Sequence, residues 1–307
     1  MTLRQDTAVD FARHVVRIAA IVVVAAAAGC SKSAPPSRDH ADELSAAAKA
    51  QPSCNPGRDP DVEMEKRKLR IAKGIFRGSQ RIAVEGELEL WDTPYGRWWV
   101  VADNFDTFSD VLGEQAVELY GDTVRGVHAS DVVLDCGAHF GGFTRVALDR
   151  GAKMVVAIEI APENAACLRK NFASEIAAHR VVVYEKGVWD SEGSMTLERK
   201  NHTWADQVSS GGAGPSVPVT TIDKIVSDLH LPRVDFIKMD IEGAERNALA
   251  GAAATLKAFQ PRMAIASYHL PDDVDVIAPL VHSNQPAYTT CISGKGLGHG
   301  YMTLFFK

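Results

Sequence analysis

The chain has 307 residues, of which 46% are hydrophobic and 23% are charged, a balance typical of globular proteins. This composition excludes a disordered or collagen-like chain, and the length allows one large domain or two small ones. The net charge of −6 and the lack of a long basic run argue against nucleic acid as a partner. No two cysteines form a C-x-x-C pair, so the sequence predicts neither a zinc site nor a dense disulfide framework.

The first thirty residues have the pattern of an export signal. Arg13 and Arg17 precede an unbroken apolar run over residues 18–28, which is too short to cross a hydrocarbon core of roughly 30 Å. Small residues then lead directly into Cys30, which resembles the lipobox of bacterial lipoproteins, where that cysteine is acylated. We therefore expect residues 1–30 to be a leader and Cys30 a lipid tether to the membrane. Two alternatives stay open: export without lipidation or with an uncleaved anchor, and translation from Met64, which would give a cytoplasmic protein.

Residues 31–60 are rich in Ser, Ala, Pro and Asp and show no apolar periodicity, which predicts a flexible tether. Cys54 lies inside this segment, and we expect it to be an unpaired surface thiol. Cysteines in the body of the chain are expected to behave as small buried apolar residues.

Residues 61–130 are predicted to form a lead-in that packs on the main domain. Alternating apolar residues between Ile82 and Val101, interrupted by a turn at residues 93–96, predict a hairpin. Apolar positions recur at helical spacing from Phe108 to Leu119 and predict a helix.

From residue 131 to the end, short apolar runs alternate with helical patterns, as in a parallel sheet buried on both faces. Two further strands near the C-terminus are so closely joined that they must be antiparallel to each other. The sequence therefore predicts an α/β domain over residues 131–307, with a seven-stranded, mostly parallel sheet, an antiparallel C-terminal hairpin and helices on both faces. Residues 209–215 are small and Gly-rich and predict a mobile loop. The seven expected strands are residues 132–134, 154–158, 181–184, 234–237, 263–266, 288–292 and 301–306.

The first strand of this series ends in a glycine-containing turn, where open α/β sheets bind their ligands. Asp135 stands where a G-x-G-x-x-G dinucleotide motif needs its first glycine, which disfavours a nicotinamide-dependent oxidoreductase. Asp135 would suit an ammonium group, and Glu159, at the end of the second strand, would suit ribose hydroxyls. S-adenosylmethionine carries both an ammonium group and a ribose, so these two residues predict it as the ligand. The alternatives are a tight turn for the glycines, a helix N-cap for Asp135 and a surface position for Glu159.

A second set of polar residues follows the strand expected at residues 234–237. Asp240 and Glu242 alternate with apolar neighbours, so both side chains can point toward the same end of the sheet. His269 ends the next strand. The alternative for Asp240 and Glu242 is that a helix N-terminus favours their negative charge. The alternative for His269 is a histidine in a surface loop.

With these motifs, residues 131–287 resemble the FkbM family of S-adenosylmethionine-dependent methyltransferases. The resemblance rests on residues 133–141, 155–159 and 219–223, and above all on residues 236–245. It implies a Rossmann-like class I methyltransferase fold, S-adenosyl-L-methionine as cofactor, and methyl transfer to a hydroxyl on a sugar or other small metabolite. The chain departs from the common family pattern at His139 and Ile160. The residues expected to bind the cofactor are Asp135, Gly137, Ala138, His139, Gly141, Glu159 and Gly187.

Methyl transfer from a sulfonium is a displacement, so a protein must align donor and acceptor and exclude water. A hydroxyl acceptor must also lose its proton, for which Asp240, Glu242 and His269 are the candidate bases. Our hypothesis is that Asp240 faces the methyl group and the acceptor while Glu242 or His269 assists. Carboxylates are hard oxygen ligands for a divalent metal, but nothing in the sequence requires one. The competing hypothesis is an exported lipoprotein that keeps the fold as a non-catalytic binding module, because S-adenosylmethionine is made in the cytosol.

Overall fold

The computed structural model describes residues 51–54, 60–102, 104–198, 207–209, 211, 214–294 and 302–307. The predicted leader, Cys30 and most of the tether lie outside these residues, as do parts of the loop expected at residues 209–215. Among the described helices, none combines the length and the apolar character needed to cross a membrane.

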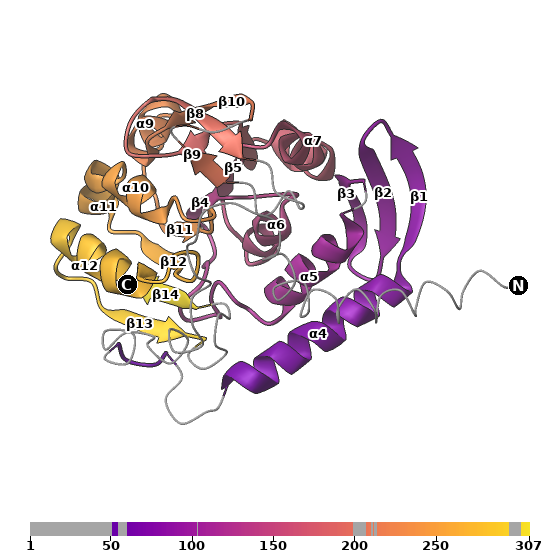
Figure 1. Ribbon diagram of the computed structural model, residues 1–307, viewed down its shortest axis with the longest axis horizontal. Helices are drawn as coiled ribbons and strands as arrows, with labels where there is room; N and C mark the ends of the chain where they lie inside the picture. Colours follow the sequence, from indigo (N-terminus) through magenta and orange to yellow (C-terminus); the bar gives the residue numbers. More distant parts are fainter. Residues whose placement is uncertain are drawn as a thin grey trace, which may run out of the picture. The chain divides into compact units, whose positions relative to one another are not determined.

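The main domain is built on a seven-stranded sheet, as predicted (Figure 1). Five strands run parallel, and the C-terminal hairpin adds one strand antiparallel to both of its neighbours. One expected strand is displaced from residues 234–237 to Phe236–Met239. Asp235 lies in the irregular segment just before this strand, where its side chain accepts a hydrogen bond from the Val132 amide at 2.8 Å. The strand order is β13 (Thr290–Ser293), β14 (Thr303–Phe306), β12 (Arg262–Ala266), β11 (Phe236–Met239), β4 (Val132–Cys136), β5 (Met154–Ile158) and β6 (Val181–Tyr184).

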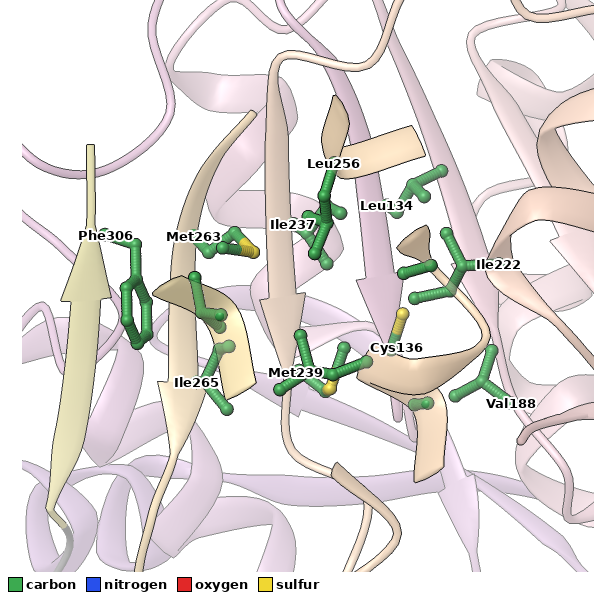
Figure 2. Packing of buried hydrophobic residues seen from close by; sticks show 14 of the residues in the cluster. Leu134, Cys136, Val188, Ile222, Ile237, Met239, Leu256, Met263, Ile265 and Phe306 are labelled. Carbon is green, nitrogen blue, oxygen red and sulfur yellow. The ribbon is translucent and has the colours of Figure 1, made fainter. Parts of the chain in front are cut away.

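Helices cover both faces of this sheet, because successive strand residues point to opposite sides. Leu134 and Ile237 face one helical layer, shown in Figure 2, while Val133 and Phe236 face the other. The first layer contains α9 (Ile222–Asp228), α10 (Glu245–Ala250), α11 (Ala253–Phe259) and α12 (Asp273–Asn284). The second contains α5 (Phe105–Ala116), α6 (Gly142–Asp149), α7 (Pro162–Asn171) and α8 (Ala173–Ala177).

Local sequence signals explain where several of these helices begin. Pro162 stands at the first position of α7, where its missing amide hydrogen costs nothing. Thr221 caps α9, and its side chain accepts a hydrogen bond from the Lys224 amide at 3.0 Å. The start of α7 fixes the turn after β5 of the main sheet, whereas α9 follows a strand of a second, smaller sheet.

The lead-in contains more structure than the predicted hairpin and helix. The three strands β1 (Gln80–Glu85), β2 (Leu88–Thr93) and β3 (Gly96–Val101) form a meander with a first turn at Gly86. The preceding helix α4 (Pro60–Gly78) was not predicted and packs against α5. A Cβ at Gly113 of α5 would lie 3.1 Å from the Lys68 carbonyl oxygen, so the glycine permits a close approach of the two helices.

A second, four-stranded sheet was also not predicted. Its strand order is β7 (Gly187–Val188), β10 (Ser216–Thr220), β8 (Gly193–Glu198) and β9 (Gln207–Ser209). Its strands carry many polar and half-buried residues, so they lack the continuous apolar runs of the main sheet.

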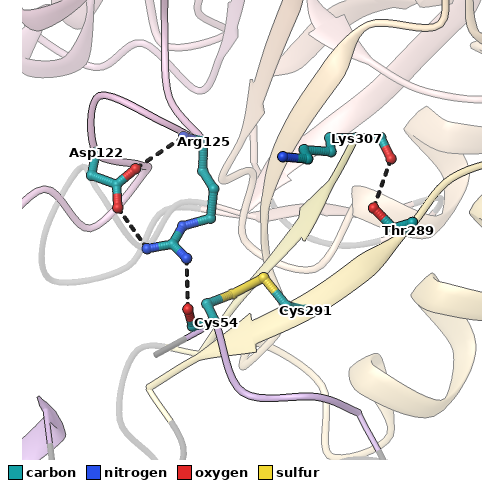
Figure 3. Close-up of a disulfide and its surroundings, with 6 residues drawn as sticks. All are labelled: Cys54, Asp122, Arg125, Thr289, Cys291 and Lys307. Atoms are coloured by element: carbon teal, nitrogen blue, oxygen red, sulfur yellow. Dashed lines mark hydrogen bonds and ion pairs between the residues drawn. A yellow bond between two sulfur atoms is a disulfide. The ribbon is translucent and has the colours of Figure 1, made fainter. Parts of the chain in front are cut away.

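Cys54 is not an unpaired thiol, and that prediction is wrong: it forms a disulfide with Cys291 of β13 (Figure 3). The two cysteines are 237 residues apart, so their spacing carried no signal. The Ile292 amide donates to the Pro52 carbonyl at 3.0 Å, and the Cys54 amide donates to the Ile292 carbonyl at 2.9 Å. Residues 51–54 therefore pair with the edge of the main sheet. Cys136 and Cys167 are buried and free, as expected for cysteines in the body of the chain, but the same expectation is wrong for Cys291.

Candidate active site

The turn between β4 and α6 lies against the turn that follows β11. Gly137 has φ +78°, and a Cβ there would lie 1.9 Å from the Asp240 carbonyl oxygen. Gly141 has φ +103°, and a Cβ there would lie 2.1 Å from the Phe172 ring. Both glycines are therefore required by packing within the chain, whatever ligand the turn binds.

The carboxylate of Glu159, after β5, holds two neighbouring turns together. One oxygen accepts the His139 amide at 2.7 Å and the other accepts the Ala161 amide at 2.8 Å. Burial raises the pKa of Glu159, and these amides oppose that rise. Because each carboxylate oxygen has a second lone pair, Glu159 can still accept hydrogen bonds from ribose hydroxyls.

Asp135 is completely buried and is already paired inside the protein. Its Oδ2 accepts a hydrogen bond from the Thr144 hydroxyl at 2.7 Å, and its Oδ1 lies 3.4 Å from Nζ of Lys238. Lys238 also donates to the Gly137 carbonyl at 2.7 Å. Burial lowers the pKa of Lys238, but the carboxylates of Asp135 and Asp240 outweigh it and raise that pKa above its usual value. The charge partner of Asp135 is thus Lys238, and its expected contact with a cofactor ammonium stays a prediction.

The other expected cofactor residues lie around the ends of β4 and β5. His139 has φ +53°, and burial, followed by the charge of Lys238, lowers its pKa to about 4, so the ring is neutral at pH 7. Ala138 is buried, and its amide donates to the Ile158 carbonyl at 3.0 Å. Gly187 lies in β7, where a Cβ would lie 2.6 Å from Ile160. Their contacts with a cofactor also stay predictions.

Asp240, directly after β11, is held by two tyrosines. The Tyr120 hydroxyl donates to its Oδ2 at 2.6 Å, and the Tyr268 hydroxyl donates to its Oδ1 at 3.4 Å. Tyr120 comes from the segment between α5 and β4 and is only 3% exposed. The lead-in therefore supplies part of the site.

A tight turn after Asp240 presents Glu242. Glu242 has φ +57°, a left-handed conformation that is uncommon for a residue with a side chain. The buried carboxylate of Glu245 stabilises this turn, because it accepts the Ile241 amide at 2.9 Å and the Gly243 amide at 3.0 Å. Glu245 therefore holds Glu242 in place.

His269, after β12, lies between three carboxylates. Its Nε2 is 3.3 Å from Oδ1 of Asp240 and 3.4 Å from Oε1 of Glu242, and its Nδ1 is 2.9 Å from Oε1 of Glu245. The structure thus brings together all three candidate bases, Asp240, Glu242 and His269.

The surroundings of these three groups shift their pKa values in different directions. Burial lowers the pKa of His269, but the three carboxylates outweigh it and hold that pKa well above its ordinary value. Burial likewise opposes ionisation of Asp240, yet His269 and Lys238 hold the pKa of Asp240 well below its usual range. The pKa of Glu242 is raised, mainly by burial. A protonated His269 cannot accept another proton, so in this form Glu242 is the strongest base of the three.

Several residues of the site were not given a role by the sequence. Lys238, Glu245 and Tyr268 lie in or beside the quoted motifs, and their positions at strand ends could have identified them. Tyr120 gave no signal, since 120 residues separate it from Asp240.

Comparison with known proteins identifies the central part of the chain. Residues 135–285 match the model of the methyltransferase FkbM domain. A search of curated proteins finds no match.

Among solved structures, the chain is similar to an FkbM methyltransferase from Methylobacillus flagellatus, with 18% identity and a TM-score of 0.47 over 81% of this chain. This chain spans 61% of that protein. It is also similar to Trm5 of Methanocaldococcus jannaschii in complex with adenosine, with 16% identity, a TM-score of 0.36 and coverage of 83% of this chain and 68% of that one. A precorrin-6y C5,15-methyltransferase from Geobacter metallireducens is 12% identical, with a TM-score of 0.35 and coverage of 59% and 80%. Likeness of this degree identifies neither a function nor a substrate.

The residues at the strand ends fit S-adenosyl-L-methionine. Glu159 keeps acceptor capacity for ribose hydroxyls, and the half-buried carboxylates of Asp240 and Glu242 suit a cationic sulfonium. When bound, this cofactor supplies the methyl group. Residues 135–285 therefore match a methyltransferase domain of the FkbM type, and S-adenosyl-L-methionine is the cofactor of such a domain.

Proposed function

We propose that this protein methylates a hydroxyl oxygen of a sugar or another small metabolite. The observation that carries the proposal is the group formed by Asp240, Glu242 and His269. This group supplies carboxylates that can accept a proton at the carboxyl ends of β11 and β12, beside the expected cofactor residues. A hydroxyl acceptor needs such a group because it must lose its proton as it attacks the methyl carbon.

The three residues of this group have different proposed roles. Asp240 stays ionised, fixed by Tyr120 and Tyr268, and its charge keeps His269 protonated. Glu242, with its raised pKa, receives the acceptor proton. The remaining task of the chain is to hold donor and acceptor in line.

The test compares Asp240→Asn and Glu242→Gln with the wild-type protein. Each variant should lower turnover with a panel of hydroxyl-bearing sugars by about 100-fold or more, while isothermal titration shows nearly unchanged binding of S-adenosylmethionine. Glu192→Gln, an exposed carboxylate elsewhere on the main domain, is the matched control and should behave as wild type. Unaltered turnover in both site variants would refute the proposed roles.

The competing function, a binding module without turnover, makes a different prediction in the same experiment. It predicts no methylated product with any acceptor, including with saturating S-adenosylmethionine. The carboxylates of Glu159, Asp240 and Glu242 favour the enzyme, because a binding module without catalysis has no chemical need for buried or half-buried carboxylates at the carboxyl ends of these strands.

We also propose that Cys30 is acylated and tethers the protein to a membrane. The Cys54–Cys291 disulfide supports export, because such bonds persist mainly in oxidising compartments. The mass of the mature N-terminus from native membranes tests the proposal: an acylated Cys30 is the expected result, and an N-terminus at Met1 or Met64 would contradict it.

A further inference from the structure

The group formed by Asp240, Glu242 and His269 has the geometry of a metal centre as well as that of a proton relay. Each of the three offers one donor atom, and these atoms all lie within 4.8 Å of one another. We propose that they bind one divalent cation through Oδ1 of Asp240, Oε1 of Glu242 and Nε2 of His269, and that the cation displaces a proton from His269 to solvent when it binds.

The spacing of the donor atoms is the first argument. Nε2 of His269 lies 3.3 and 3.4 Å from the two carboxylate oxygens. Ligands bound at about 2.1 Å stand roughly 3.0 to 3.4 Å apart when they surround a metal at octahedral or tetrahedral angles. Nε2 therefore stands at ligand spacing from each carboxylate oxygen, and the two oxygens lie within 4.8 Å of each other.

The orientation of His269 is the second and independent argument. Its side chain is only 5% exposed, and Nε2 points between the two carboxylates without the geometry of a hydrogen bond to either. A buried ring nitrogen aimed at two carboxylate oxygens but aligned with neither has the placement of a ligand.

The surroundings of His269 resemble the outer shell of known metal sites. Its other nitrogen, Nδ1, lies 2.9 Å from Oε1 of Glu245, and Glu245 is itself fixed by two backbone amides. Histidine ligands commonly face a carboxylate on the side opposite the metal, which sets their orientation. Tyr120 plays the corresponding part for Asp240, because it occupies the oxygen that does not face His269.

A neighbouring group of similar composition is a weaker candidate. Glu245, His269 and Asp273 also lie within reach of one another. However, Asp273 already pairs with Arg246 at 2.9 Å and accepts the Leu270 amide at 2.7 Å. The charge of Asp273 is therefore compensated within the protein, whereas among the described residues Glu242 forms an ion pair with His269 alone.

The expected cation is one that accepts both oxygen and imidazole ligands, such as Mn²⁺ or Zn²⁺. Its place beside the acceptor rests on the proposed function: a cation here would bind the acceptor oxygen and lower the pKa of that hydroxyl, so that in the metal-bound form the proton would leave to water and Glu242 would act as a ligand. The binding site itself does not depend on methyl transfer.

The test uses the full chain, treated with EDTA and free of S-adenosylmethionine, with Mn²⁺ as the probe. Electron paramagnetic resonance of free Mn²⁺ should show one equivalent bound, and pulsed spectra should show coupling to a directly bound imidazole nitrogen. Glu242→Gln should weaken binding at least about tenfold, whereas Glu192→Gln should leave it unchanged.

Two results would overturn the proposal. One is the absence of binding at millimolar Mn²⁺, and the other is binding without nitrogen coupling or with unchanged affinity in Glu242→Gln. The wild-type nitrogen coupling decides the question even if a variant fails to fold. Because no cofactor or acceptor is present, the outcome is separate from that of the methyl-transfer assay.

Discussion

Tyr120 donates a 2.6 Å hydrogen bond from its hydroxyl to Oδ2 of Asp240, joining the lead-in to the end of β11 across 120 residues of sequence. The matched methyltransferase segment begins at residue 135, so this contact comes from outside it. The proposed site is therefore incomplete without the segment that precedes the family domain.

Replacing Tyr120 with Phe tests this dependence. The variant keeps the ring but removes a hydrogen bond to a charged group, which is worth about 1.5 to 3 kcal/mol. We expect turnover to fall about 10- to 100-fold with nearly unchanged binding of S-adenosylmethionine. Steady-state kinetics measures the turnover and isothermal titration measures the cofactor binding. Unchanged turnover in Tyr120→Phe would show that the hydrogen bond to Asp240 does not support the site.

The buried pair of Asp135 and Lys238 should be a major determinant of stability. Lys238→Met leaves the Asp135 carboxylate buried without its cation, which should lower the free energy of unfolding by about 3 to 5 kcal/mol. The double variant Asp135→Leu with Lys238→Met should lose less than the sum of the single changes. Urea unfolding followed by circular dichroism measures these values. The control Lys224→Met removes an exposed pair with Asp228 and should change stability little; equal losses in the two lysine variants would contradict the expectation.

Reduction of the Cys54–Cys291 disulfide should lower thermal stability, because the bond closes a very long loop. Dithiothreitol should lower the unfolding temperature of the wild-type protein but not that of Cys54→Ser. Mass spectrometry after alkylation in denaturant provides an independent count. In the unprocessed full chain, in which Cys30 carries no lipid, three of the 5 cysteines should be labelled without reductant and all with it. Full labelling without reductant would mean that the disulfide does not form.

The protonated His269 gives the stability of the protein a particular pH dependence. Its pKa is raised on folding, so its contribution is fully present below the unfolded value of about 6.5 and is lost as pH rises toward the folded value. In EDTA, this group should lower the free energy of unfolding by about 1.4 kcal/mol per pH unit above pH 7. His269→Gln should lack this slope, while His128→Gln, at an exposed position, should keep it. Denaturant titrations between pH 7 and 8.5 measure the slopes, and the same slope in His269→Gln would show that the ring is not charged.

The main sheet could be predicted from sequence because its strands are buried on both faces and therefore read as continuous apolar runs. For the same reason, Asp240, Glu242 and His269 could be placed at neighbouring strand ends. Helix α4 was missed because only a few of its side chains, including Ala72 and Ile75, are buried, so its apolar stripe is narrow. The small sheet was missed because its strands are half-exposed and carry no strong alternation.

The remaining features depend on contacts between distant residues. Nothing local marks Tyr120 as a partner of Asp240 or Cys54 as a partner of Cys291, since neither spacing nor periodicity extends over such separations. Asp135 was assigned to a ligand because its buried partner, Lys238, lies on the adjacent strand in register, and that pairing is visible only in the folded sheet.

The Cys54–Cys291 bond also determines how mechanical force would enter the domain. Along the backbone, a pull on the N-terminal segment would reach α4 first and load the lead-in, including the segment that carries Tyr120. The disulfide instead passes the force from Cys54 directly into β13, at the edge of the sheet, so residues between the two cysteines bear little of it. If the N-terminal segment is held at a surface, the site at the carboxyl ends of β11 and β12 lies outside the path of that tension.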